Sequence, residues 1–374
     1  MIINFNNIIN DLAEKKVICY GARYGADNYQ YGSLSLLEQN GIKPYKFADT
    51  YYYNANFFSY EVLSPGALLE LDRLERIAVI ITSGFAHEIY EFLITNKLRG
   101  EIYVLPEYTN DLQGFNIVLN NNRFKMFMNK MQKVINNLYD DVSKDIVKNI
   151  IKGRETFLPK GFVKAYKDTL KQSGKHQYFI NEIFHYLKNK KNISFIDCGA
   201  FTGDTIQDAV ELGIKLTNSY CFEPDQGCFL QLKKKIHQLS LDDNIITIQK
   251  GLWHKEQKLF LENRYQGGSS VTNNLTDDSI ELVVLDNELH GVQVDMLKMD
   301  IEGSELNALQ GAMKIIIKNN PILAISIYHK FEDLADIPFF LMEKLTDYHY
   351  LVRHHSGTKE TVLYCIPNTI KVDL

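Results

Sequence analysis

The sequence predicts an α/β protein with two parallel sheets, and three observations support this fold class. Short apolar runs alternate with amphipathic segments over residues 16–108, the alternation stops over 124–151, and it resumes after 193. Strands that alternate with helices are joined by right-handed crossovers into parallel sheets. The 374 residues also exceed the usual size of one hydrophobic core, so two domains are expected.

Residues 1–110 are predicted to form a small Rossmann-like α/β domain. Strands are expected at 17–21, 44–49, 77–84 and 101–106, and helices through Leu37 and Glu38 and at 64–71 and 87–97. Gly21, Gly25 and Asp49 follow the first two strands, a pattern similar to that of nucleotide-binding folds. The same turn can also simply let a helix pack closely on a strand. Binding of a cofactor or sugar nucleotide, binding of a glycan carrier and dimer assembly all stay open for this domain.

Residues 111–180 are predicted to be a helical linker. Apolar residues at helical spacing along 124–151 predict one long helix, and they are Phe127, Met131, Val134, Ile135, Leu138, Val142, Ile146 and Ile150. Such a stripe indicates a core or an interface, which makes a homodimer a reasonable expectation. Gly153 and Pro159 then end this segment, and two further helices are expected before Asn192.

The second domain is predicted over residues 181–374. Its strands are expected at 192–199, 219–224, 245–251, 258–263, 281–286, 294–300, 321–329, 348–355 and 361–367. Its helices are expected at 204–213 and 226–239, after Ser304, and at 337–345. The segments at 258–263 and 281–286 are expected to pair in opposite directions, and the last two strands to form a hairpin.

Charge and cysteine content exclude several classes of protein. A net charge of −5 and a pI near 6.1 argue against a nucleic-acid binder. The five cysteines form no CxxC pair, and their odd number argues against a disulfide framework. No run has the length of a membrane span, and the first residues lack the order of a signal peptide. We therefore expect a cytoplasmic protein, and the abundance of Asn, Ile and Lys indicates a bacterial source.

The loop FIDCGAFTGDT, residues 195–205, predicts a nucleoside-cofactor site. Asp197 ends a buried strand, Gly199 permits a tight turn, and Gly203 lets a helix begin close to the sheet with its free N–H groups exposed. Glu223 ends the next strand, where an acid would hold both ribose hydroxyls. The candidate cofactor-binding residues are Asp197, Gly199, Ala200, Phe201, Thr202, Gly203 and Glu223.

The details of this loop favour S-adenosylmethionine over NAD. Its pattern is D-x-G-x-x-x-G, and Ala200 stands where a diphosphate site carries its middle glycine. A carboxylate at Asp197 would repel a diphosphate but can recognise the α-amino group of a methionine tail. An ordinary strand–turn–helix without a ligand is the alternative interpretation.

Five segments together resemble the FkbM-type family of S-adenosylmethionine-dependent methyltransferases over residues 175–374. They read FIDCGAFTGD, FEPD, GLWHKEQKLF with Ser269 and Ser270 after it, LKMDIEGSELNALQGA and ISIYHKFEDLADIPFF. The resemblance implies the seven-stranded sheet of class I methyltransferases and O-methylation. It also implies that the acceptor is a sugar in polysaccharide, glycolipid or natural-product biosynthesis.

Asp300, Glu302 and His329 are the candidate catalytic residues. Asp300 ends the fourth parallel strand beside the first, and His329 ends the neighbouring strand. Asp300 could hold the acceptor hydroxyl, take its proton with His329 as a general-base pair, or bind a divalent cation such as magnesium. Glu302 and Glu305 could instead only favour a helix N-terminus, and His329 could be structural. No Cys or His ligands recur at zinc spacing.

The leading hypothesis is an O-methyltransferase acting on a sugar hydroxyl, with adenine near Leu252. Two rivals stay open. One is an NAD(P)-dependent sugar-modifying oxidoreductase or epimerase, although Tyr139 is followed by Ser143 rather than Lys at the fourth place. The other is a non-catalytic scaffold in glycan assembly that merely binds the cofactor.

Overall fold

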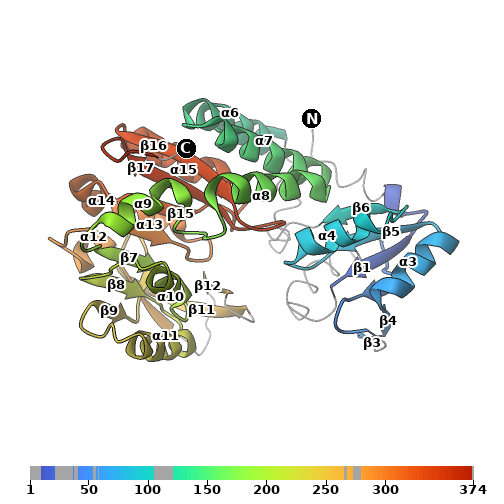
Figure 1. Ribbon diagram of the computed structural model, residues 1–374, viewed down its shortest axis with the longest axis horizontal. Helices are drawn as coiled ribbons and strands as arrows, with labels where there is room; N and C mark the ends of the chain where they lie inside the picture. Colours follow the sequence, from blue (N-terminus) through green and yellow to red (C-terminus); the bar gives the residue numbers. More distant parts are fainter. Residues whose placement is uncertain are drawn as a thin grey trace. The chain divides into compact units, whose positions relative to one another are not determined.

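A computed structural model describes residues 10–21, 37, 41–53, 56–57, 59–104, 121–264, 268–272 and 279–372 (Figure 1). The chain separates into two compact units. One comprises Met1–Asn129, Asp145–Asp168 and His354–Glu360, and the other Lys130–Lys144, Thr169–Arg353 and Thr361–Leu374. Each unit contains a largely parallel sheet, which confirms the predicted fold class. The boundaries at 110 and 180 stay a prediction. No helix in the described part of the chain is long and apolar enough to span a membrane.

The first unit contains a six-stranded sheet in the order β3-β4-β2-β1-β5-β6. Its strands are β1 (Lys16–Tyr20), β2 (Lys46–Ala48), β3 (Asn56–Phe57), β4 (Tyr60–Leu63), β5 (Ile77–Ile81) and β6 (Glu101–Val104), and its helices include α3 (Pro65–Leu74) and α4 (Ala86–Thr95). All neighbouring pairs are parallel except β3 with β4. The four expected strands are present. Strands β3 and β4 were not expected, because two to four residues are too few to show a periodicity.

The carboxyl ends of β1 and β2 hold two of the residues that the sequence singled out. Gly21 has φ +124°, and a Cβ there would lie 2.8 Å from Ser83 Cβ, so this glycine serves close strand packing. Asp49 Oδ1 accepts hydrogen bonds from the amides of Tyr51 (2.8 Å) and Tyr52 (2.9 Å). This carboxylate therefore forms a turn. Gly25 and Glu38 lie outside the described residues.

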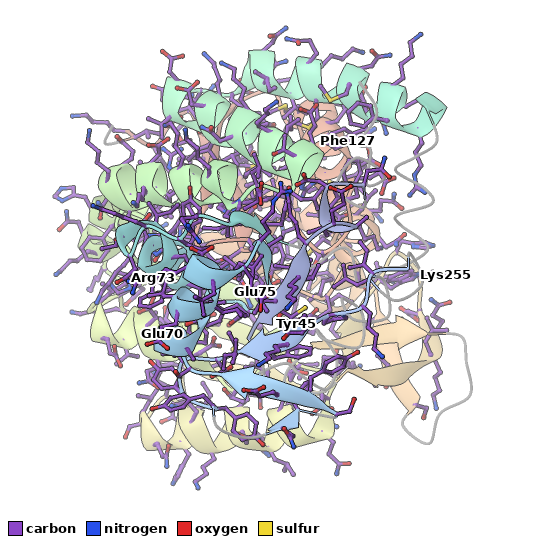
Figure 2. The ribbon with its side chains drawn as sticks, turned by 90° about the vertical axis from the view of Figure 1, so that its right-hand side faces the viewer. Tyr45, Glu70, Arg73, Glu75, Phe127 and Lys255 are labelled. Atoms are coloured by element: carbon purple, nitrogen blue, oxygen red, sulfur yellow. The ribbon has the colours of Figure 1, made fainter. Side chains whose placement is uncertain are left out.

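The surface of this unit carries a small charged cluster beside an aromatic ring. Figure 2 labels Tyr45 and Glu75 on this face, and Lys16 contacts both. Its ammonium pairs with Glu75 and lies 4.3 Å from the centroid of the Tyr45 ring. Exposed pairs of this kind contribute little to stability.

The helix predicted over 124–151 is two helices, so that expectation was wrong. They are α6 (Asn121–Asn137) and α7 (Asp141–Thr156), followed by α8 (Pro159–Ser173) and α9 (Asn181–Asn189). The break occurs because Asp140 Oδ1 accepts from the amide of Ser143 (2.6 Å) and thereby starts a new helix. The amide of Tyr139 leaves the helix and donates to the carbonyl of Tyr350 (2.9 Å).

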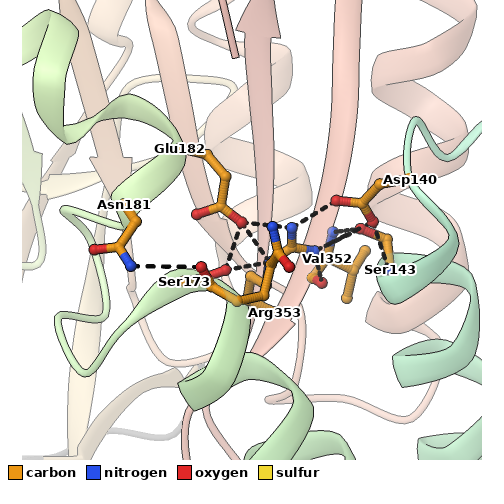
Figure 3. Close-up of polar contacts among 8 residues, drawn as sticks. Asp140, Ser143, Ser173, Asn181, Glu182, Val352 and Arg353 are labelled. Carbon is orange, nitrogen blue, oxygen red and sulfur yellow. Dashed lines mark hydrogen bonds and ion pairs between the residues drawn. The ribbon is translucent and has the colours of Figure 1, made fainter. Parts of the chain in front are cut away.

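Asp140 is also part of a buried polar network around Arg353 (Figure 3). The guanidinium of Arg353 is fully buried and lies 2.6 Å from both Asp140 Oδ2 and Glu182 Oε1. It also donates to Ser143 Oγ (2.7 Å) and to Ser173 Oγ. One arginine thus joins the start of α7, the end of α8, α9 and a strand of the second sheet.

The second unit is built on a seven-stranded sheet in the order β16-β17-β15-β14-β7-β8-β9. Its strands are β7 (Phe195–Cys198), β8 (Ser219–Phe222), β9 (Ile245–Ile248), β14 (Met296–Met299), β15 (Ile322–Ser326), β16 (Tyr348–His354) and β17 (Thr361–Pro367). The five strands from β15 to β9 are parallel, and β17 is antiparallel to β15. The order is that of the sheet the sequence predicts, and β14 lies beside β7 as expected.

Helices α10 (Asp204–Glu211) and α11 (Gln226–Gln238) share one hydrophobic core with α9 and the sheet. The remaining helices are α12 (Leu285–Glu288), α13 (Glu305–Gln310), α14 (Met313–Asn319) and α15 (Asp333–Lys344). The single helix expected after Ser304 is therefore divided. Gly311 interrupts it where a Cβ would lie 2.4 Å from the carbonyl oxygen of Trp253, and the Asp286 carboxylate accepts from the first amides of α14.

A separate four-stranded sheet has the order β10-β13-β11-β12. Its strands are β10 (Gly251–Leu252), β11 (Gln257–Arg264), β12 (Gly268–Thr272) and β13 (Ser279–Val283). The expected antiparallel pairing of β11 with β13 is confirmed. The backbones of Ser269 and Ser270 lie in β12, a strand that the sequence did not indicate.

Candidate functional site

The loops that follow β7 and β14 meet at the carboxyl edge of the seven-stranded sheet. Strands β7 and β14 are adjacent and parallel, with Asp197 opposite Lys298 and Cys198 opposite Met299. Gly199 has φ +81°, and a Cβ at this position would lie 1.9 Å from the carbonyl oxygen of Asp300. Only glycine lets these loops approach so closely. The proximity of Gly199 and Asp300 is what the sequence predicts.

The β7–α10 loop is held by backbone hydrogen bonds. The amides of Gly199 (3.0 Å) and Ala200 (2.9 Å) both donate to the carbonyl of Phe222, and the amide of Gly203 donates to the carbonyl of Ala200 (2.8 Å). Gly199 with φ +81°, Phe201 with φ +46° and Gly203 with φ +84° give the loop three left-handed residues before α10 begins. A left-handed phenylalanine costs energy and is typical of a functional loop. Thr202 is half-buried in the same turn.

Glu223 braces this loop from the neighbouring strand. Its Oε2 accepts from the amide of Phe201 (2.9 Å) and its Oε1 from the amide of Asp225 (2.9 Å). Burial raises the pKa of Glu223 to about 7, although both amides act in the opposite direction. Each carboxylate oxygen keeps a second lone pair, so the group can still accept from ribose hydroxyls.

Asp197 has a partner that the sequence analysis missed. Its side chain is 0% exposed and Lys298 Nζ lies 2.9 Å from its Oδ1. Burial raises the pKa of Asp197 to about 6, against the effect of Lys298. Asp197 was expected to contact the α-amino group of the cofactor directly, but its buried carboxylate leaves no accessible surface for that contact. The signal that could have revealed the pair is a lysine inside an otherwise apolar strand, in register with an aspartate.

Leu252 lies in β10, where it is buried and pairs with Val283. Its neighbour Gly251 is close to the residue after Glu223, because a Cβ on Gly251 would lie 3.8 Å from Pro224 Cβ. The structure therefore brings the segment of Leu252 towards that of Glu223, as the expected adenine site requires.

His329 lies among three carboxylates at the ends of β14 and β15. Its Nδ1 is 3.0 Å from Glu305 Oε1, and its Nε2 is 3.3 Å from Asp300 Oδ1 and 3.7 Å from Glu302 Oε2. Glu305 is fully buried, whereas the side chains of Asp300 and Glu302 are 22% and 41% exposed. The three candidate catalytic residues are thus brought together, with two carboxylates facing outwards.

The electrostatics of this cluster favour an imidazolium. Burial alone would lower the pKa of His329, but Glu305, Asp300 and Glu302 together raise it well above its usual value. Burial would raise the pKa of Asp300, and His329 and Lys298 more than offset this, so it lies below its usual value. The carboxylates favour the protonated ring, which does not accept a further proton, so they disfavour the general-base role expected for His329.

Two tyrosines that the sequence analysis did not single out hold Asp300. Tyr178 Oη donates to Asp300 Oδ2 (2.8 Å), and Tyr328 Oη donates to Asp300 Oδ1 (3.3 Å). Tyr328 follows β15, next to His329. Tyr178 lies 122 positions before Asp300, just before α9. No local pattern connects such distant residues.

The cluster is a poor fit for magnesium. Ligand atoms of Asp300, Glu305 and His329 lie within 4.8 Å of one another. However, Glu305 Oε1 already accepts from the amides of Ile301 (2.8 Å) and Gly303 (3.3 Å), and one of the three ligand atoms is an imidazole nitrogen. Magnesium prefers oxygen ligands in a near-ideal octahedron. The magnesium interpretation of Asp300 is therefore not supported.

Comparison with known proteins gives a family model for part of the chain and a related fold for nearly all of it. Residues 197–352, which include both loops, match the family model described as the Methyltransferase FkbM domain. The crystal structure of methyltransferase FkbM from Methylobacillus flagellatus KT superposes with a TM-score of 0.68 at 19% identity. That match covers 96% of this chain and 93% of that one, so the two share a fold over nearly their whole lengths.

A putative rRNA methylase from Clostridium thermocellum matches 49% of this chain and 91% of its own, at 14% identity. Its TM-score of 0.33 is too low to support an inference about this chain. No curated protein matches the sequence.

Proposed function

We propose that the second unit, whose residues 197–352 match the family model of the FkbM methyltransferase domain, transfers a methyl group from S-adenosylmethionine to a sugar hydroxyl. One observation carries the proposal: the loop with the cofactor pattern and the loop with Asp300 are in contact, at Gly199 and Asp300. A cofactor on the first loop would lie beside an acceptor held by the second. Ligands of open α/β sheets bind at this edge.

On the cofactor side, S-adenosylmethionine would supply an electrophilic methyl group. Glu223 would accept hydrogen bonds from the ribose hydroxyls with the lone pairs left free by Phe201 and Asp225. The backbone of residues 199–203 would follow the methionine part, and the segment around Leu252 would receive the adenine. Asp197 would act indirectly, through Lys298 and the loop.

On the acceptor side, Asp300 would orient the attacking hydroxyl. A sulfonium is already strongly electrophilic, so alignment of oxygen, carbon and sulfur supplies much of the rate. Asp300 would also receive the hydroxyl proton as the methyl group is transferred and S-adenosylhomocysteine is released. The lowered pKa of this carboxyl suits a late proton transfer rather than a strong base. His329 would keep Asp300 in place.

A sugar is the acceptor class that fits the two outward carboxylates best. Asp300 and Glu302 both lie within 4 Å of His329 Nε2, at 3.3 Å and 3.7 Å, and both are partly exposed. Two neighbouring acceptor groups can receive hydrogen bonds from vicinal hydroxyls. A glycan or nucleotide-linked sugar is therefore the proposed partner.

The test is transfer of a labelled methyl group to a panel of neutral sugars, nucleotide sugars, polysaccharide extracts and catechols. We expect label in a sugar fraction, and this label should survive alkali. A methyl ether of a hydroxyl resists alkaline hydrolysis, whereas a methyl ester is cleaved. Asp300→Asn should lower the rate at least ~100-fold, whereas Asp242→Asn, at an exposed pair with His237, should not change it. Alkali-labile label, or transfer only to catechols, would refute the sugar proposal. Binding without transfer to any acceptor would favour the scaffold.

A further inference from the structure

We propose that Lys298 is a positioning residue that holds the β7–α10 loop in its cofactor-binding form. The inference rests on the proposed function, because it concerns how the cofactor loop is shaped. Lys298, a buried lysine within β14, would then do more than neutralise the charge of Asp197.

Lys298 makes two contacts on the side of β7. Its side chain is 4% exposed, and its Nζ lies 2.9 Å from Asp197 Oδ1. The same ammonium donates to the carbonyl oxygen of Gly199 at 2.5 Å. Gly199 is the residue at which the chain leaves β7 and turns left-handed. The second contact therefore fixes the orientation of the peptide group from which the loop departs.

Two further groups explain why a cation is stable at this depth. The ring of Tyr178 lies with its centroid 5.2 Å from Lys298 Nζ, within the range of a cation–π interaction. The hydroxyl of the same tyrosine donates to Asp300, whose negative charge also favours the ammonium. Lys298 is thus enclosed by two carboxylates, a carbonyl and an aromatic face.

Neutralisation alone does not require this geometry. A buried carboxylate needs an opposite charge, but that charge need not touch the loop. An ammonium has three N–H donors, and here one of them reaches a backbone carbonyl in addition to the carboxylate. The charge-balancing role and the positioning role of Lys298 can be separated by mutation. Asp197 interacts with Lys298 through its charge, whereas Gly199 interacts with it through a carbonyl hydrogen bond.

The experiment measures S-adenosylhomocysteine binding by calorimetry and the thermal midpoint for the wild type and three variants. The variants are Asp197→Asn, Lys298→Met and the double variant with both changes. The double variant removes both charges, so it should fold even if Lys298→Met alone does not. Lys258→Met in the separate sheet is the control.

If Lys298 positions the loop, Asp197→Asn and the double variant should differ in their affinity for S-adenosylhomocysteine. Asp197→Asn should bind at least about tenfold more tightly than the double variant, because Lys298 still reaches Gly199 in the single variant. The double variant should regain most of the thermal midpoint but bind about tenfold or more weakly, since one charge-assisted hydrogen bond is lost. If the double variant regains wild-type affinity, Lys298 only balances charge and the inference is wrong. If the wild type itself does not bind, the proposed function fails instead.

Discussion

The Nδ1 atom of His329 lies 3.0 Å from Oε1 of Glu305, and their side chains are 9% and 0% exposed. Glu305 also accepts from two amides of the loop after β14, so it anchors the histidine to that loop. The contact with Glu305 consequently fixes the orientation of the imidazole, and its Nε2 faces Asp300 and Glu302. The cluster thus presents carboxylates, rather than a basic nitrogen, to the outside.

Glu305→Gln should lower the pKa of His329, because it removes the nearest carboxylate that raises it. In the wild type we expect the ring to stay protonated above the pH at which an unperturbed histidine loses its proton, in NMR titrations of the histidine side chains. In the variant the ring should lose its proton at a lower pH than in the wild type. Glu343→Gln, on the exposed side of α15, should leave the signal unchanged. A wild-type ring that titrates near its usual pKa would contradict the imidazolium.

Gly199→Ala should destabilise the protein far more than Gly213→Ala. Both glycines are left-handed, with φ +81° and +74°, but only a Cβ at Gly199 would meet an atom, the Asp300 carbonyl oxygen. We expect about 1 kcal/mol for Gly213→Ala and more than ~3 kcal/mol for Gly199→Ala. Urea unfolding measures both. Equal losses would mean that the two loops do not touch.

Glu223 should make stability fall as the pH rises. Its pKa is raised from about 4.5 to about 7 on folding, so the folded state binds more protons between these values. Stability is therefore greatest below the unfolded pKa and is lost up to about pH 7, by at most ~3 kcal/mol. Glu223→Gln should flatten this part of the profile in urea unfolding from pH 4.5 to 7.5. An unchanged slope would show that Glu223 is not buried as described.

Arg353→Met should cost about 3–5 kcal/mol, because Glu182 and Asp140 would keep buried charges without their cation. The matched control is Lys148→Met, which removes an exposed pair with Asp145 and should change stability by less than ~1 kcal/mol. Adding Glu182→Gln to Arg353→Met should recover part of the loss. A small effect of Arg353→Met alone would show that the network in Figure 3 is solvated.

The sheets and the meeting of two loops could be predicted because their signals are local. Apolar runs that end on Asp197 and Asp300 mark strand ends, and adjacent parallel strands bring such ends together. The family resemblance then orders the strands. The magnesium interpretation of Asp300 and the general-base role expected for His329 both depend on charges that no strand pattern reveals.

Other features depend on contacts between distant residues. The apolar stripe continues through Leu138 into α7, so periodicity alone could not reveal the break at Asp140, which also pairs with Arg353 213 positions later. In the sequence, Lys298 is a single polar residue within an apolar strand. Its partner is revealed only when the sheet places Asp197 opposite it. Tyr178 reaches Asp300 from a segment before α9.

The most direct measurement is calorimetric titration of the wild type, Glu223→Ala and Glu211→Ala with S-adenosylmethionine and with NAD. Glu211, at the exposed end of α10, is the matched control for a lost carboxylate. We expect S-adenosylmethionine to bind the wild type and Glu211→Ala equally and Glu223→Ala at least ~10-fold more weakly, and we expect NAD not to bind. Binding of NAD alone, or equal binding of S-adenosylmethionine by all three proteins, would contradict it.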